Sequence, residues 1–221
     1  MIRGMIAILP LALGVATYGF AFGLLAAEAG FSPAAIGTMA VVVFAGSSQI
    51  AAVDQFLTTG TVVGAALAGA ALNLRYIGIV ASVVPVLREL PWPTRLVAMQ
   101  FATDENFGFT LAERAKDPSV GGAFLLGSGL ALVAAWAAST VAGAVLGAVL
   151  PDLDGMGIGF AFTAAFIAMA RSLWPGAQAA LPWGISFVLT IALVWLGLPT
   201  AAALILGALA GVGTDFAVNR P

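Results

Sequence analysis

Long apolar stretches separated by short turns dominate the pattern of hydrophobic and polar positions. A bilayer core about 30 Å thick needs roughly 20 apolar residues per helix. Apolar stretches near this length predict six membrane-spanning helices, over residues 5–27, 61–87, 122–149, 156–172, 181–197 and 199–217. The pattern therefore predicts an all-α polytopic membrane protein, with residues 1–221 forming a single transmembrane domain.

Two further apolar segments are interrupted by polar residues. Segment 34–56 contains Gly46-Ser47-Ser48-Gln49, and segment 96–115 contains Thr103-Asp104-Glu105-Asn106. Non-helical backbone at membrane depth is tolerated only where it is buried in protein or lines a watery cavity. Broken helices of this kind form the binding sites of many transporters. We therefore expect two re-entrant or broken segments, and a transport site in the first half of the chain.

The basic residues favour re-entry over full crossing. If both interrupted segments turn back, all the basic positions considered share one face, namely Arg3, Arg88, Arg95, Arg114, Lys116, Arg171 and Arg220. The positive-inside rule then predicts that both termini are cytoplasmic. An arrangement with seven or eight full spans stays open.

Composition supports the membrane assignment and excludes several kinds of site. Hydrophobic residues make up 62% of the chain and charged residues only 8%, too few to cover the surface of a soluble domain. The chain has no Cys and no His, which excludes thiolate metal sites and Ser-His-Asp catalysis. We expect no enzyme activity, no metal and no cofactor. The net charge of −2 argues against nucleic acid as a partner.

Arg75 is the most informative polar residue, because it lies near the middle of the predicted span 61–87, between Asn73 and Tyr76. An arginine at the bilayer centre costs about 2.5–3.5 kcal/mol on insertion scales, so it must face the protein interior. One interpretation is a structural ion pair between helices. The other is recognition of an anionic group, since the guanidinium matches a carboxylate.

Asp104 and Glu105 are the candidates for proton coupling, because the chain has no His to carry a proton. One acid could pair with Arg75 while the other titrates. The alternative is that segment 96–115 is an amphipathic surface helix with both acids in water.

Ser47, Ser48 and Gln49 offer two hydroxyls and an amide in the middle of an apolar segment. These groups suit a broken helix that contacts a polar ligand, or equally a helix cap with close helix packing. Asn73, Arg75 and Tyr76 complete the set of candidate substrate-binding residues.

Small residues recur at four-residue spacing, which favours tight helix packing or a partner interface, including a homo-oligomer. These pairs are Gly19/Gly23, Gly60/Gly64, Gly143/Gly147, Gly155/Gly159 and Gly207/Gly211. A short echo between residues 19–22 and 159–162, both Gly-Phe-Ala-Phe, suggests a possible inverted repeat with three spans per half.

Several short motifs follow one another in order along the chain. They are Gly19-Phe20-Ala21-Phe22-Gly23, Gly30-Phe31-Ser32-Pro33, Phe44-Ala45-Gly46-Ser47-Ser48-Gln49, Asn73-Leu74-Arg75, Thr103-Asp104-Glu105, and Gly159-Phe160-Ala161-Phe162 with Phe166. This ordered set resembles the AzlC family over roughly residues 10–172. The family usually follows the Asn-x-Arg motif with a His, whereas this chain has Tyr76.

The resemblance implies the large permease subunit of a two-component, proton-driven exporter of branched-chain amino acids, with methionine as a further candidate substrate. It also implies a small AzlD-type membrane subunit as partner and the bacterial inner membrane as location. Alternating access around a midplane site would be the mechanism. A channel, an exporter of another small solute, and a structural or assembly subunit remain the alternatives.

Overall fold

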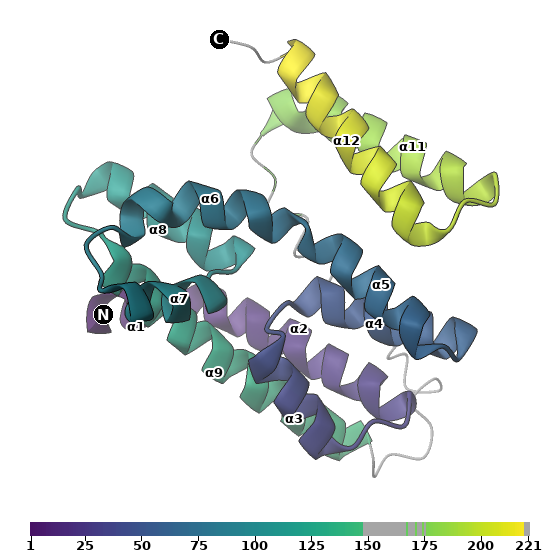
Figure 1. Cartoon of the computed structure of the whole chain (residues 1–221), viewed down its shortest axis with the longest axis horizontal. Helices are drawn as coiled ribbons and strands as arrows, with labels where there is room; N and C mark the ends of the chain where they lie inside the picture. The colour runs from purple at the N-terminus through teal and green to yellow at the C-terminus, as the bar shows by residue number, and fades with distance from the viewer. Residues whose placement is uncertain (148–166, 168–170, 172–173, 175, 219–221) are drawn as a thin grey trace. The chain divides into compact units, whose positions relative to one another are not determined.

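The computed structural model describes residues 1–147, 167, 171, 174 and 176–218 (Figure 1). All the regular elements within these residues are helices, as the apolar pattern predicts. Apart from Ile167 and Arg171, the predicted span 156–172 lies outside the described residues, as does the second half of the Gly-Phe-Ala-Phe echo. The chain divides into two compact units, Met1–Phe166 and Ile167–Pro221.

Four of the described helices are long and apolar enough to cross a membrane, judged by length and composition. They cover Leu9–Glu28, Val62–Leu87, Gly122–Gly147 and Ala177–Trp195. The fold is thus that of an all-α polytopic membrane protein.

The frame of the first unit is a pair of helices that run side by side in the same direction (Figure 1). Helix α1 (Ile2–Ala7) leads into α2 (Leu9–Glu28), which packs along α9 (Gly122–Gly147). A Cβ at Gly23 would meet the backbone of Thr140 and Ala144, so the two helices touch backbone to backbone. Glycine permits this approach because it has no side chain, as in close helix pairs of membrane proteins.

The segment 34–56 turns back at mid-depth. It consists of α3 (Pro33–Val42) and α4 (Gly46–Thr59), with a non-helical junction at residues 43–45. The position of a Cβ on Gly46 lies 2.9 Å from Tyr18 and 3.0 Å from Trp136, both midway along the α2–α9 pair. The ring of Phe56 then lies 5.7 Å from that of Phe31, which follows α2. The hairpin therefore enters and leaves at the end of the frame where α2 finishes.

The segment 96–115 forms the matching hairpin from the other end. It consists of α7 (Trp92–Gln100) and α8 (Asp104–Lys116), joined at residues 101–103. Phe101 packs against Gly129, two turns into α9. Asp117, which follows α8, pairs with Arg3 at 2.7 Å. Leu90, just before α7, lies against Gly122 at the start of α9, so both ends of this hairpin lie where α9 begins. The segment is thus a hairpin and not one continuous helix.

The predicted span 61–87 is two helices that meet at Leu74, α5 (Val62–Asn73) and α6 (Arg75–Leu87). Helix α5 lies antiparallel to α4, since Gly69 packs against Ser48 and Gly64 packs near Thr59. Helix α6 continues to the opposite end, where Val86 meets Gly122 at the start of α9. The two helices together run the length of the frame in the direction opposite to α2 and α9 (Figure 1).

One end of the first unit collects all of its basic residues except Arg75. We call the end where α2 and α9 begin the basic end, and it carries Arg3, Arg88, Arg95, Arg114 and Lys116. Arg95 stabilises the turn before α7 by donating to the carbonyls of Arg88 and Leu90, each at 2.7 Å. Glu28 lies at the opposite end, at the last turn of α2. Both hairpins turn back, so these five basic residues of the first unit share one end.

The ion pair at the basic end also shapes the α8–α9 loop. Ser119 donates to Asp117 Oδ1 through its hydroxyl at 2.7 Å and through its backbone at 3.0 Å. These hydrogen bonds, together with the one from Arg3, lower the pKa of Asp117 from 3.8 to about 2. The carboxylate thus stays ionised over the whole physiological range.

The second unit contains an antiparallel helix pair, α11 (Ala180–Trp195) and α12 (Thr200–Val218), preceded by a short 3-10 turn at Ala177–Ala179. Gly197, with a φ of 86°, occupies the left-handed region at the turn between the helices. A Cβ at Gly211 would lie 3.0 Å from Ser186 and 3.1 Å from the carbonyl of Pro182. Small residues therefore let these two helices approach closely, as they do in the frame.

Candidate functional site

Arg75 joins three helices at mid-depth of the first unit. Its guanidinium lies 2.7 Å from Asp104 Oδ2 at the start of α8, and it donates to Ser47 Oγ at 2.7 Å in the first turn of α4. Arg75 itself begins α6. One side chain therefore binds the inner ends of both hairpins, as only a forked cation with several donors can do.

The pair is not sealed inside the protein. The side chains of Arg75 and Asp104 retain 36% and 28% of their accessible surface. A charged pair exposed to hydrocarbon would be costly, so this part of the surface requires water or protein beside it. It can also be approached by a polar solute.

Neighbouring side chains support Arg75 from the same helix junction. Ser48 Oγ donates to Asn73 Oδ1 at 2.6 Å, which ties α4 to the end of α5. The hydroxyl of Tyr76 donates to the carbonyl of Phe44 at 3.3 Å, and the Arg75 guanidinium lies 5.5 Å from the centre of the Tyr76 ring. A cation over an aromatic face is held by the charge distribution of the ring. Tyr76 thus orients both the arginine and the junction of the first hairpin.

The two hairpin tips also touch each other. Gln100 Nε2 donates to the carbonyl of Val42 at 2.9 Å, and the rings of Phe44 and Phe101 lie 6.1 Å apart. Phe44 has a φ of 40°, a left-handed conformation that costs a residue with a side chain and is commonest at functional sites. The strain lies where the backbone reverses and its polar groups leave the helical pattern.

Gln49 is buried beneath the tip of the first hairpin, with 1% of its surface exposed. Its Oε1 accepts from Trp136 Nε1 at 3.1 Å. The indole can only donate, so the amide orientation is fixed by chemistry. Trp136 in turn stacks on Phe22 at 5.6 Å and lies 5.5 Å from the Tyr18 ring. The Nε2 group of Gln49 has no hydrogen-bond partner among the described residues.

The tip of the second hairpin is held by Asn106, which is fully buried. Its Oδ1 accepts from the backbone N–H of Thr103 at 2.7 Å, and its Nδ2 donates to the carbonyls of Phe101 and Leu125. Asparagine here caps the start of α8 and fastens it to α9. The amide is fully satisfied, in contrast to that of Gln49.

Most of the candidate residues lie together in this cluster. The structure connects Ser47, Ser48, Asn73, Arg75, Tyr76 and Asp104 through the bonds described above, and it places Gln49 against Trp136. Glu105 is half-buried in the first turn of α8, and within the described residues no hydrogen bond or ion pair joins it to Arg75. Asp104 is thus the acid that pairs with the arginine.

Sequence reasoning did not identify Trp136 or the capping role of Asn106. Trp136 is 87 positions from Gln49 and lies in an otherwise apolar span, so nothing nearby marks it. Asn106 had a signal, because Asn three residues after Thr103 fits a capping box at a helix start.

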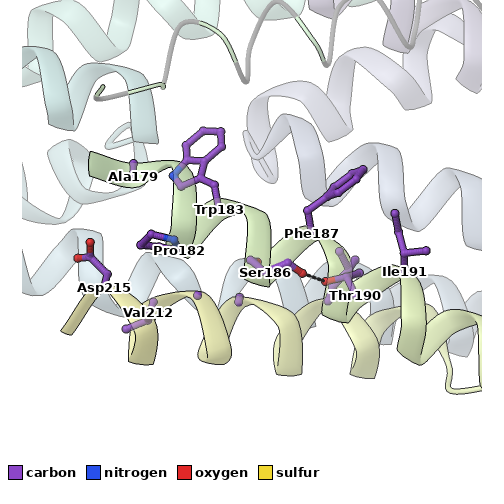
Figure 2. Close-up of a pocket in the computed structure, with 12 residues that line it drawn as sticks. Ala179, Pro182, Trp183, Ser186, Phe187, Thr190, Ile191, Val212 and Asp215 are labelled. Carbon is purple, nitrogen blue, oxygen red and sulfur yellow. Dashed lines mark hydrogen bonds between the residues drawn. The ribbon is translucent and has the colours of Figure 1, made fainter. Parts of the chain in front are cut away.

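The described residues hold no group of three or more acidic side chains that could bind a metal ion. A separate groove of about 760 Å³ lies in the second unit, between α11 and α12. Figure 2 shows side chains from both helices around it, including Trp183, Phe187 and Asp215. Its lining is largely apolar, which is typical of a helix pair that faces lipid or another protein surface.

The fold defines a polytopic membrane protein with broken helices around a shared arginine. The AzlC protein family model matches residues 10–150, which includes every residue of the cluster. The chain belongs to the AzlC family, whose members are transport-associated membrane proteins. No curated protein and no solved structure matches it.

Proposed function

We propose that this chain is the permease subunit of an exporter of branched-chain amino acids, with methionine as a further substrate. The observation that carries the proposal is the position of Arg75, shared between Ser47 and Asp104 where the two hairpins meet. A zwitterionic substrate needs a cation for its carboxylate and an acceptor or acid for its ammonium group. Both kinds of group converge here, on helices whose polar ends point into the protein.

The substrate-binding residues in this proposal are Ser47, Ser48, Gln49, Asn73, Arg75 and Tyr76. Asp104 and Glu105 carry the coupled proton, because the chain has no His. Tyr76, which stands where the family usually has His, anchors the hairpin tip through the carbonyl of Phe44. Transport proceeds by alternating access, in which the hairpins open to one side of the membrane and then to the other.

The proposed setting is the bacterial inner membrane, with both termini cytoplasmic and a small AzlD-type subunit as partner. The cluster of basic residues at one end of the first unit supports this orientation, because positive loops face the cytoplasm. Helix α5 supports the need for lipid or a partner, since none of its residues is buried and Val62, Val63 and Leu67 are largely exposed.

Export from cells loaded with dipeptides tests the proposal. Cells that express the chain with and without the neighbouring small membrane protein are fed dipeptides of leucine, isoleucine, valine or methionine, and the released amino acid is measured. Export that requires both subunits and stops in Arg75→Ala supports the proposal. Normal membrane levels of wild type without export of any of the four amino acids would overturn the substrate. Flux far above the rates of carriers would indicate a channel instead.

A further inference from the structure

The two hairpins are internal equivalents in sequence as well as in shape. The first turns at Phe44-Ala45-Gly46-Ser47-Ser48-Gln49, and the second at Phe101-Ala102-Thr103-Asp104-Glu105-Asn106. Both begin with Phe-Ala, and both carry an amide five positions after the phenylalanine. Each turn is followed by a helix that starts at mid-depth and runs back to the end from which its hairpin came.

The contacts of Arg75 follow the same equivalence. Its two terminal nitrogens bind Ser47 and Asp104, which occupy the same position of the two turns. The two phenylalanines contact each other at 6.1 Å. The two hairpins, α3–α4 and α7–α8, are therefore equivalent elements that enter from opposite ends, and Arg75 binds both of their turns. This relation differs from the one suggested by the Gly-Phe-Ala-Phe echo.

The two equivalent turns differ in the groups that they offer. The second provides its own carboxylate to Arg75, and its amide, Asn106, has all its hydrogen bonds made within the protein. The first has serine in place of the acid. Ser47 accepts from Arg75, so its own hydroxyl proton remains available to an acceptor.

The amide of Gln49 is the second, independent observation at this turn. It is 1% exposed, its Nε2 has no hydrogen-bond partner among the described residues, and its oxygen is occupied by Trp136. Gln49 lies three positions after Gly46, so these two residues share a face of α4. The Trp136 ring links the two, since it binds Gln49 and also lies 3.0 Å from the Cβ position of Gly46.

The backbone at the start of α4 adds further hydrogen-bond donors, which carry partial positive charge. Ala45 occupies the N-cap position of α4, and no side chain caps the helix there. The first N–H groups of a helix point along its axis and carry partial positive charge. The first turn of α4 thus combines uncapped N–H groups, the Ser47 hydroxyl, the buried Gln49 Nε2 and the Arg75 guanidinium. All of these are donors, and they match an acceptor with two oxygens and one negative charge.

We propose that the first turn of α4, with Gln49 and Arg75, is the subsite for the carboxylate of the amino-acid substrate, and that this carboxylate displaces Asp104 from Arg75. The inference rests on the proposed function and adds which group of the substrate binds where. Asp104 is then an internal competitor that neutralises Arg75 until substrate arrives. The acid released by the exchange is free to take the ammonium group or a proton.

Binding to the purified full-length chain, with its partner subunit where the two purify together, tests the subsite. The probes are two matched pairs, L-leucine with L-leucinamide and isovalerate with isovaleramide, titrated by calorimetry. The two acids should bind and the two amides should bind roughly tenfold more weakly or not at all, because charged hydrogen bonds are lost. Equal binding of acid and amide would overturn the subsite.

Two variants separate the roles of the turn. Gln49→Leu should weaken binding of both acids roughly tenfold, whereas Gln55→Leu on the same helix serves as the matched control and should bind as wild type does. Gln49→Glu keeps an acceptor for Trp136 but removes the donor, so it should weaken binding too if Gln49→Leu fails to fold. Binding by both Gln49 variants at the strength of the control would contradict the proposal.

Asp104→Asn distinguishes an internal competitor of the substrate from an ion pair with a structural role alone. Removing the internal competitor should tighten binding of leucine and isovalerate roughly fivefold or more, while Asp54→Asn, at an exposed site on α4, should leave it unchanged. Binding of the acids without leucine export would disprove the proposed function and leave the subsite standing. Leucine export by wild type, with no tighter binding of the acids in Asp104→Asn, would overturn the subsite and leave the proposed function standing. A wild-type protein that binds neither acid would also overturn the subsite.

Discussion

The guanidinium of Arg75 and the carboxylate of Asp104 lie 2.7 Å apart and join the start of α6 to the start of α8. Neither residue lies at an end of the first unit. Each begins a helix at mid-depth, where the chain has interrupted its hydrogen-bonded pattern. The ion pair therefore fixes the first turn of α6 relative to the first turn of α8, and breaking it frees both helix starts.

Substitution of Arg75 should separate charge from geometry. Arg75→Ala removes both contacts and should lower export roughly tenfold or more, since hydrogen bonds to charged groups contribute about 1.5–3 kcal/mol each. Arg75→Lys keeps the charge but cannot reach Ser47 and Asp104 with two arms, so it should recover only part of the activity. Initial rates of labelled leucine export at matched membrane levels measure this. Full activity in Arg75→Ala would contradict a role in recognition.

Asp104→Asn should uncouple export from the proton gradient. The amide keeps the size and one acceptor of the side chain but cannot exchange a proton. In proteoliposomes, leucine efflux by wild type should rise when a proton gradient is imposed, and efflux by the variant should not respond. Glu105→Gln is the companion variant, because it identifies which of the two acids carries the proton. A normal response in both variants would exclude this pair from coupling.

Substitution of Gly23 should disturb the frame without touching the polar cluster. A Cβ at this position meets the backbone of Thr140 and Ala144, so Gly23→Ala forces α2 and α9 apart and should cost about 1–3 kcal/mol of stability. Gly14→Ala, on the same helix, meets nothing within 4 Å and should be neutral or stabilise the protein by about 0.5–1 kcal/mol. Thermal unfolding in detergent distinguishes the two. Equal melting temperatures would disprove the backbone contact.

The Asp117 carboxylate should make stability depend on pH only in acid. Its pKa is about 2 in the folded protein against 3.8 for the free group, so its contribution is complete above pH about 4 and disappears as pH falls toward 2. Asp117→Asn should thus melt slightly below wild type at pH 6, with the difference vanishing near pH 2. Both curves are recorded in the same detergent. A difference that persists at pH 2 would argue against the shift.

Single cysteines can test the two-sided arrangement, because the chain has none of its own. Ser119→Cys lies at the basic end, next to Asp117, and Thr61→Cys lies at the opposite end, between α4 and α5. An impermeant maleimide added to intact cells should label the second and not the first. Labelling of both from the same side would contradict opposite ends.

The sequence marks the breaks within the hairpins better than the break in the long helix. Polar residues at Ser47 and Asp104 predict interruptions, and α4 and α8 begin within one residue of them. The break at Leu74 lies between two polar residues, Asn73 and Arg75, which the sequence marks as candidate binding residues within one continuous span and not as helix ends.

Long-range pairings account for what could not be predicted. The partner of Gln49 is a tryptophan in α9, and the partner of Asn106 is the carbonyl of Leu125. These contacts depend on how the hairpins pack against the frame, which local pattern does not encode. The sequence does predict that Arg75 pairs with one of the two acids at 104 and 105, because the chain has few charged side chains and an arginine inside the membrane needs an acidic partner.

The glycine contact between α2 and α9 decides which parts of the first unit can move. Two backbones in direct contact have no side chains that could repack into a second arrangement, so this pair has one stable position. The hairpin tips, in contrast, contact each other through a hydrogen bond from the Gln100 side-chain amide and through the rings of Phe44 and Phe101. Such contacts break and re-form at small cost. Any opening of the first unit therefore moves the half-length helices of the hairpins against a fixed support.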